Sequence, residues 1–258
     1  MRKLKWVPTP TFLYRNYLYE KIAKSINFGK EFIDVGSGNG YFLKKLVEAG
    51  YYGEAIDISK KAVRVAKSFL KKNKSIKVKV ADVFKYRKER EVDIVFSFET
   101  LEHIEDDLGA MKSMHRLIRK GGVFILSVPA HQSLWSKMDE IKGHYRRYER
   151  KELVDKIRNA GFRISYVWTY GFPFLSLIRK FSGGGRLIKT FGRWEKLPRL
   201  KSKSNDVRGW ESSIQEEYSP FLASILTNPL LWFIPFKIMD LFVNTDLGFG
   251  YIVVARKQ

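Results

Sequence analysis

Cysteine is absent from this chain of 258 residues, and glutamine occurs only three times. The lack of cysteine excludes a disulfide scaffold, a thiolate zinc site and a cysteine nucleophile. The low glutamine content, together with abundant Lys and Arg, is typical of heat-adapted proteins. No apolar run follows the basic N-terminus, so we expect no secretory signal and predict a cytoplasmic location.

A long unbroken apolar segment is also lacking. The longest uncharged stretch, Tyr218–Phe236, has nineteen residues and contains Pro220, Pro229 and Pro235. A membrane-spanning helix needs about twenty apolar residues without such interruptions. We therefore expect the protein to be peripheral if it meets a membrane at all.

Acidic residues are few relative to basic ones. The chain has 48 Lys and Arg against 27 Asp and Glu, which gives a formal charge of +21. Basic residues are concentrated in residues 1–30 and 179–208. Such a charge favours a polyanion or an anionic surface, with nucleic acid and anionic lipid as candidates, and a general solubility charge is the alternative.

Short apolar segments alternate with helical patterns along most of the chain. This alternation predicts βαβ units and therefore an α/β fold, a doubly wound, Rossmann-like, mostly parallel seven-stranded sheet. The predicted helices are Thr11–Ile26, Tyr41–Ala49, Lys60–Lys71, Leu108–Arg119 and Glu149–Ala160. The predicted strands are Glu31–Val35, Tyr52–Ile56, Ile76–Val80, Val92–Phe98, Val123–Val128, Phe162–Trp168 and Gly250–Arg256.

The alternation stops after Gly171 and returns only at the last strand. We therefore predict an N-terminal helical segment (1–27), one α/β domain (28–171 and 246–258) and a helical insertion before the last strand (172–245). Such a long connection is rarely without function. The insertion joins a basic part, Arg179–Arg208, to an apolar part, Phe221–Val243, and so suggests a substrate lid or a membrane-surface element.

The segment Phe32–Gly40 reads as a strand, a glycine-rich turn and the start of a helix. Glycines in such a turn let the backbone approach a ligand closely. Asp57 closes the next predicted strand, where a carboxylate can accept hydrogen bonds from ribose hydroxyls. Together these features predict a nucleoside cofactor.

The spacing of the turn is G-x-G-x-G, which differs from the dinucleotide pattern of dehydrogenases, the structural alternative. Asp34 precedes the first glycine and would repel a pyrophosphate while suiting a cation. With Glu54–Ser59, Ala81–Phe84, Asp93–Ile104 and Gly121–Pro129, the sequence resembles class I S-adenosylmethionine-dependent methyltransferases over residues 28–170 and 248–256.

This resemblance implies S-adenosyl-L-methionine as the cofactor and a role for each matching residue. The methionine part would be held by Asp34, Gly36, Ser37, Gly38 and Gly40. Asp57 would bind the ribose, with Ile58 beside it, and Asp82 and Val83 the adenine. Phe98 and Glu99 would lie next to the sulfonium.

Glu99, Glu102 and His103 follow the fourth predicted strand with a spacing that can share one helical face. They are plausible ligands for a hard divalent ion, as in ubiquinone-pathway and small-RNA methyltransferases that resemble this segment. Because many members with this local sequence use no metal, we predict no metal and keep these three residues as the alternative site.

A segment rich in reactive side chains follows the fifth predicted strand, at the sheet edge where open α/β sheets bind ligands. His131 and His144 lie in it and, with His103, are the candidate catalytic bases. The candidate acceptor contacts are Glu99, Trp135, Tyr145, Arg146 and Arg147. The alternative is that the last part of this segment only folds onto the next helix.

The sequence thus predicts a methyltransferase that acts on oxygen or nitrogen of a small or lipid-linked acceptor, with an anionic membrane surface as a further partner. An RNA methyltransferase is the second candidate, which the positive charge suits. Against RNA, the aromatic residues cluster in an apolar stretch rather than among basic residues. A non-catalytic cofactor-binding protein at a membrane surface is the third.

Overall fold

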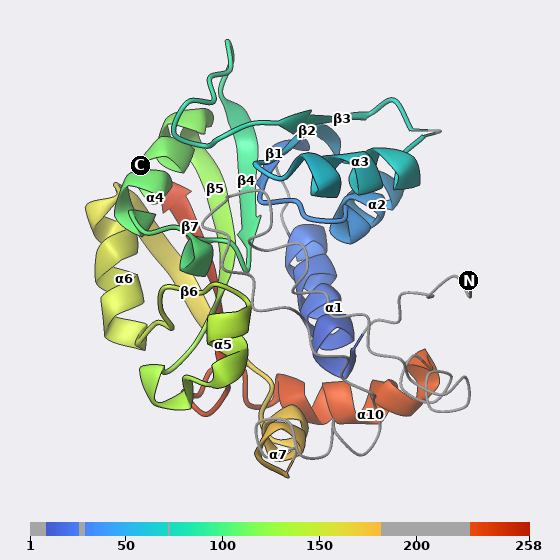
Figure 1. The fold of residues 1–258 in the computed structure, drawn as a ribbon, viewed down its shortest axis with the longest axis vertical. Coiled ribbons are helices and arrows are strands. Elements are labelled where there is room, and N and C mark those ends of the chain that lie inside the picture. Colours follow the sequence, from blue (N-terminus) through green and yellow to red (C-terminus); the bar gives the residue numbers. More distant parts are fainter. Residues whose placement is uncertain (1–8, 26–28, 72, 182–227) are drawn as a thin grey trace.

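The computed structural model describes residues 9–25, 29–71, 73–181 and 228–258 (Figure 1). Seven strands form a single sheet in the order β3-β2-β1-β4-β5-β7-β6. Only β7 runs antiparallel to its neighbours β5 and β6. The strands are β1 (Glu31–Val35), β2 (Tyr52–Asp57), β3 (Ile76–Val80), β4 (Val92–Phe98), β5 (Ile118–Pro129), β6 (Phe162–Tyr170) and β7 (Gly250–Lys257). The predicted doubly wound, Rossmann-like fold is confirmed.

Helices cover both faces of this sheet (Figure 1). Because side chains alternate along a strand, neighbouring residues enter opposite layers, and in β1 Phe32 joins one core cluster while Ile33 joins the other. The first layer contains α1 (Pro10–Ser25), α2 (Tyr41–Glu48) and α3 (Lys60–Phe69), and the second contains α4 (Asp107–Leu117) and α6 (Arg150–Asn159).

The boundary between α4 and β5 differs from the prediction. We expected the helix to continue to Arg119 and to end at the glycine pair, but α4 ends at Leu117 and β5 begins at Ile118. Ile118 pairs with Val92, and the register then shifts before Ile94 pairs with Val123. A Cβ on Gly122 would lie 2.8 Å from the Asp93 carbonyl oxygen, so the glycines serve an irregular strand rather than a helix end.

Two described helices belong to the predicted insertion, α7 (Phe174–Phe181) and α10 (Pro229–Asp240). Residues 182–227 lie outside the described residues, and with them the three glycines at 183–185, the Ser-rich stretch at 199–204 and the beginning of the apolar part. The bounds of the insertion therefore remain a prediction. Within the described ranges, no helix is long and apolar enough to cross a membrane.

Helix α10 packs on α1 through one carboxylate and one aromatic ring. Asp240 accepts hydrogen bonds from the hydroxyls of Tyr14 (3.2 Å) and Tyr17 (2.8 Å) and pairs with the Lys21 ammonium at 2.8 Å. The Phe236 ring lies 4.9 Å from that of Tyr14. These contacts join chain segments more than two hundred residues apart, and they fix α1 across the carboxyl ends of the strands (Figure 1).

The chain beyond β5 is held by a buried carboxylate in α5 (Lys137–Ile141). Asp139 is 2% exposed and pairs with the Arg147 guanidinium at 2.7 Å. It also accepts hydrogen bonds from the Ser136 hydroxyl at 2.8 Å and from His144 Nδ1 at 3.0 Å. These contacts lower the pKa of Asp139 well below its usual range although burial alone would raise it.

Asp139→Asn should therefore destabilise the protein by about 3 kcal/mol, because it leaves the buried Arg147 guanidinium without a counter-charge. Denaturant unfolding at neutral pH measures the effect. Glu140→Gln is the matched control, since Glu140 is the exposed neighbour in the same helix and should change the unfolding free energy by about 0.5 kcal/mol or less. Equal stabilities of the two variants would contradict this role.

Candidate functional site

The candidate site lies where β1, β2 and β4 end, and the glycine turn after β1 forms its floor. Gly36, Gly38 and Gly40 all have positive φ angles, of 78°, 54° and 78°. A Cβ on Gly36 would lie 2.2 Å from the Thr100 hydroxyl, whereas a Cβ on Gly38 would meet nothing within 4 Å. Gly38 therefore faces open space, as a backbone that receives a ligand must.

Asp57 at the end of β2 is tied to this turn. One carboxylate oxygen accepts the Gly38 N–H at 2.9 Å, and the other accepts the Ser59 N–H at 2.8 Å. Each oxygen keeps a further lone pair for a ligand hydroxyl. The ribose role implied for Asp57 is compatible with this geometry.

Asp34 in β1 is 3% exposed and lies beside the glycine turn. Burial, and secondly the negative charge of Asp57, raise the pKa of Asp34 to about 8. A ligand ammonium at this position would offset the cost of ionising the carboxyl. The methionine part of S-adenosylmethionine carries such an ammonium, so the residues present fit the cofactor that the resemblance implies.

The residues assigned to the adenine lie at the adjoining strand end. Asp82 follows β3, and its carboxylate accepts the Phe84 N–H at 2.9 Å. Val83 is buried, whereas Ile58 after β2 is 44% exposed. An exposed apolar side chain beside a buried one offers a surface on which a flat aromatic base can pack.

Aromatic rings from α1 and α2 cover the end of β4. The Tyr19 ring stacks on Phe98 with 3.7 Å between ring centroids and 6° between planes. Phe42 meets the Phe98 ring edge-on at 5.0 Å. The Tyr19 hydroxyl also lies 2.7 Å from the Ser127 hydroxyl of β5. Helix α1 therefore closes the side of the site where the resemblance places the sulfonium.

Glu99 follows β4 with a positive φ of 51°, unusual for a residue with a side chain. Its carboxylate pairs with the Arg15 guanidinium at 2.5 Å and accepts hydrogen bonds from Ser127 (2.8 Å) and Tyr170 (3.0 Å). Burial would raise its pKa, but Arg15 and these two hydroxyls outweigh that effect and lower the pKa of Glu99. Glu99 is thus an ionised, fully engaged carboxylate.

Glu102 and His103 lie in a short 3-10 helix, η1 (Leu101–His103), that begins after Glu99. Both carboxylate oxygens of Glu102 and the Nδ1 atom of His103 are buried, and none of these atoms has a hydrogen-bond partner in the described part of the chain. Burial, then the charge of Glu99, raise the pKa of Glu102, and burial, then His144, lower that of His103 to about 3.

Among the described residues, Glu102, His103 and His144 form a group whose potential ligand atoms lie within 4.8 Å of one another. Buried carboxylate oxygens and an imidazole nitrogen without partners are a donor set that a divalent ion fits. The alternative metal set that we considered contained Glu99 in place of His144. The structure brings His144 to this cluster and directs Glu99 to Arg15.

The remaining predicted site residues lie apart from this cluster or are engaged in holding the fold. His131 Nδ1 lies 3.3 Å from Glu149, and its Nε2 lies 3.0 Å from the Asp246 carbonyl oxygen. Arg146 pairs with Asp107 at 2.8 Å, and Arg147 pairs with Asp139. Tyr145 is 40% exposed, and its N–H donates to the Glu102 carbonyl oxygen. The acceptor contacts assigned to Trp135, Tyr145, Arg146 and Arg147 thus remain predictions.

Sequence reasoning missed four side chains that shape the site, namely Arg15, Tyr19, Lys142 and Tyr170. Arg15 and Tyr19 belong to a helix that carries no motif. The Lys142 ammonium has no hydrogen bond or ion pair within the described residues, and burial, then the charge of Arg15, lower its pKa. No spacing rule connects these residues with β4, and only the folded sheet brings them together.

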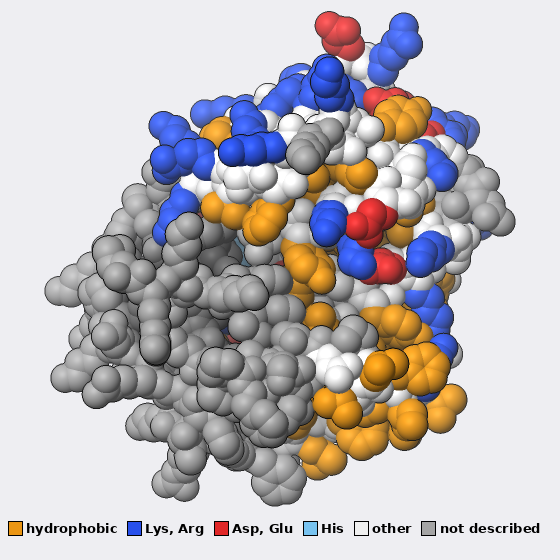
Figure 2. All heavy atoms as spheres, turned by 90° about the vertical axis from the view of Figure 1, so that its right-hand side faces the viewer, with side chains coloured by type: hydrophobic (Ala, Val, Ile, Leu, Met, Phe, Trp, Pro, Cys, Tyr) orange, Lys and Arg blue, Asp and Glu red, His pale blue; other side chains and the backbone are white. Residues whose placement is uncertain are grey.

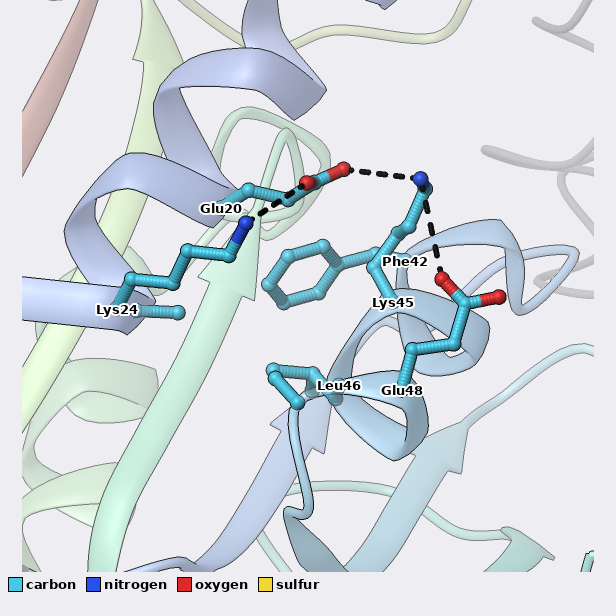
Figure 3. A pocket seen from close by; sticks show the side chains of 8 residues that line it. Glu20, Lys24, Phe42, Lys45, Leu46 and Glu48 are labelled. Atoms are coloured by element: carbon cyan, nitrogen blue, oxygen red, sulfur yellow. Dashed lines mark ion pairs between the residues drawn. The ribbon is translucent and has the colours of Figure 1, made fainter.

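A groove between α1 and α2 lies next to this site (Figure 3). Its charged side chains pair with one another: Glu20 lies 3.8 Å from Lys24 and 3.2 Å from Lys45, and Lys45 lies 3.9 Å from Glu48. Phe42 reaches from this groove to Phe98. The groove therefore packs α1 against α2 rather than offering free charged groups to a ligand.

Known proteins resemble the chain in both sequence and fold. The ubiquinone biosynthesis O-methyltransferase of Pelagibacter ubique is 31% identical over 96 residues, which cover 37% of this chain and 40% of that protein. The malonyl-[acyl-carrier protein] O-methyltransferase 1 of Ilyobacter polytropus is 25% identical over 140 residues, 51% of this chain and 52% of that protein. The chain thus spans about half the length, or less, of these curated relatives.

Solved structures share the fold at low identity. An S-adenosylmethionine-dependent methyltransferase from Mesorhizobium loti superposes with a TM-score of 0.56 at 17% identity, covering 94% of this chain and 97% of that one. The N-methyltransferase NodS from Bradyrhizobium japonicum, in complex with S-adenosyl-L-homocysteine, gives 0.54 at 16%, covering 64% and 82%.

More than half of the chain, residues 14–167, matches the family described as Methyltransferase domain. This stretch contains the glycine turn, Asp34, Asp57 and the whole Glu99–His144 region. The chain therefore belongs to the methyltransferase domain family, and its resemblance to class I S-adenosylmethionine-dependent methyltransferases is confirmed.

Proposed function

We propose that the protein transfers a methyl group from S-adenosyl-L-methionine to oxygen or nitrogen of a small or lipid-linked acceptor. The observation that carries the proposal is the buried Asp34 carboxyl beside the open glycine turn, with Asp57 at the neighbouring strand end. This arrangement suits a ligand that presents an ammonium and a ribose together. Family membership supports the reaction class.

The chain's own contribution to such a transfer is to position the acceptor, exclude water and accept a proton. His144 is the best placed base. Its Nδ1 faces the ionised Asp139 carboxylate at 3.0 Å and therefore donates, which leaves Nε2 free to accept a proton. The His103 ring lies 4.7 Å from that of His144. A pKa of about 3 makes His103 a weak base.

Glu102, His103 and His144 are the residues that would hold a divalent ion. Such an ion supplies a Lewis acid that lowers the pKa of a bound acceptor hydroxyl. His144 would then act as a ligand rather than as the base.

A lipid-linked acceptor is supported by the names of the relatives, one concerned with ubiquinone and the other with a malonyl group on acyl-carrier protein. An anionic membrane surface as partner, and a cytoplasmic location at that surface, extend the same proposal. RNA remains the second candidate, favoured by the formal charge of +21, and a non-catalytic cofactor-binding protein the third.

Asp57→Ala should weaken binding of S-adenosyl-L-methionine by about 1.5–3 kcal/mol, the size of a lost charge-assisted hydrogen bond. Titration calorimetry measures the affinity. The unfolding temperature shows whether the variant stays folded without the hydrogen bonds that Asp57 makes to Gly38 and Ser59. Asp57→Asn keeps an acceptor oxygen and should lose less. Unchanged affinity in a folded Asp57→Ala variant would remove the ribose assignment.

Cofactor affinity should decrease as the pH is lowered, because the ligand ammonium requires an ionised Asp34. With the pKa of Asp34 at about 8 in the free protein, the affinity should drop about tenfold per pH unit between pH 7 and 5.5. Calorimetry with S-adenosyl-L-homocysteine over this range tests the slope. Asp34→Asn should bind weakly with a flatter profile, and an equal slope in both proteins would assign the effect to another group.

Mn²⁺ should bind the intact protein, and Glu102→Gln should abolish binding, because the amide removes the charge of the buried ligand. Calorimetry or electron paramagnetic resonance detects the ion without any turnover. Glu105→Gln, at an exposed position three residues later, is the matched control and should leave binding unchanged. If the intact protein binds no Mn²⁺, the cluster is a proton-transfer and packing group.

A further inference from the structure

Helix α10 exposes an apolar face that the core does not use. Leu230, Phe233 and Ile234 are 83%, 61% and 67% exposed. Positions i, i+3 and i+4 share one side of a helix, so the three side chains form a single surface, which we call the outer face. Figure 2 shows hydrophobic side chains gathered at the lower end of the molecule, where Figure 1 places α10.

The opposite side of α10 accounts for its packing in the fold. Phe236 stacks with Trp232 at 5.8 Å between ring centroids and packs on α1, and Met239 is fully buried. The helix is therefore apolar on both sides. Its inner side packs on the core. The outer face is additional apolar surface that is exposed, and such exposed apolar surface marks an interaction site.

The charges of α10 are arranged to keep the outer face free of acids. Asp240 is the one acidic residue of the helix, and it is turned inward to Tyr14, Tyr17 and Lys21. The one basic residue, Lys237, extends over the Phe233 ring with its ammonium 5.8 Å from the ring centroid. The cation of the helix therefore lies against the outer face itself, and a helix that combines a lysine with apolar side chains on one face is typical of a membrane interface.

We propose that the outer face of α10 docks on an anionic bilayer surface, with the helix lying in the plane of the interface. Charge selects this partner over a second copy of the chain. Two chains of formal charge +21 repel each other, whereas an anionic surface attracts each of them. An apolar face that carries one lysine and no acid matches the acyl boundary below anionic headgroups.

Docking by this face would place the active-site side of the protein next to the lipid. Helix α1, held to α10 by Asp240, carries Arg15 to Glu99 and Tyr19 to Phe98. The parallel strands end toward the α7 and α10 side of the molecule (Figure 1). An acceptor dissolved in the bilayer would thus reach the site from the docked surface. This last step rests on the proposed function, whereas the docking itself does not.

The test is co-sedimentation of the full chain with phosphatidylglycerol vesicles. The intact protein should sediment, and a variant combining Leu230→Ser, Phe233→Ser and Ile234→Ser should bind at least about tenfold more weakly. The matched control combines Tyr52→Ser, Phe69→Ser and Val80→Ser, which are exposed apolar positions. They belong to β2, α3 and β3, elements that lie away from α10 in Figure 1. This control should sediment like the intact protein.

Each of three results with vesicles would overturn the docking surface. The intact protein stays in the supernatant, both triple variants bind equally, or phosphatidylcholine vesicles bind as well as phosphatidylglycerol. Light scattering that shows a dimer abolished only by the α10 variant would assign the face to a second copy instead. Cofactor affinity without vesicles keeps the two proposals separate. It should be unchanged in the α10 variant, and its loss from the intact protein would count against the methyltransferase proposal alone.

Discussion

The ion pair between Arg15 and Glu99 is the contact on which the arrangement of the site depends. Glu99 leaves β4 in a left-handed conformation, and its partly buried carboxylate needs a counter-charge that the sheet does not provide. Arg15 supplies it from α1, so the first helix has to lie across the strand ends. The same helix then places Tyr19 on Phe98. The carboxylate of Glu102, three residues after Glu99, has no hydrogen-bond partner among the described residues.

Helix α1 can reach Glu99 because α10 holds it from the other side. Asp240 gathers two tyrosine hydroxyls and a lysine ammonium from successive turns of α1. Helix α10, near the end of the chain, thus sets the position of Arg15 in α1, near its beginning. The two helices meet at the ends of strands that lie between them in sequence. The insertion and the N-terminal helix therefore act together on the site, although each is separate from the glycine-turn motif.

Strands and helices with a regular apolar pattern can be predicted from the sequence. Features that depend on contacts within the folded sheet cannot. Strands such as β3 and β4 show unbroken apolar or alternating patterns, and their bounds were predicted correctly. The start of β5 was not, because Ile118 and Arg119 continue a helical pattern and only pairing with Val92 extends them as a strand. Arg15 was missed for the same reason: its role exists only once the fold brings α1 to Glu99.

Asp34 and Glu102 are two carboxyls of the site that need a nearby positive charge in order to ionise. Each is a buried carboxyl whose pKa is raised mainly by burial, and neither has a paired cation among the described residues, whereas Glu99 between them has Arg15. Ligands that bring positive charge stabilise such a protein in proportion to their binding, because they bind the folded state alone. The open glycine turn lies beside Asp34, whereas two imidazoles, those of His103 and His144, lie beside Glu102. Two similar buried carboxyls therefore differ in the neighbours that the fold gives them, and these neighbours are what the cofactor and Mn²⁺ titrations compare.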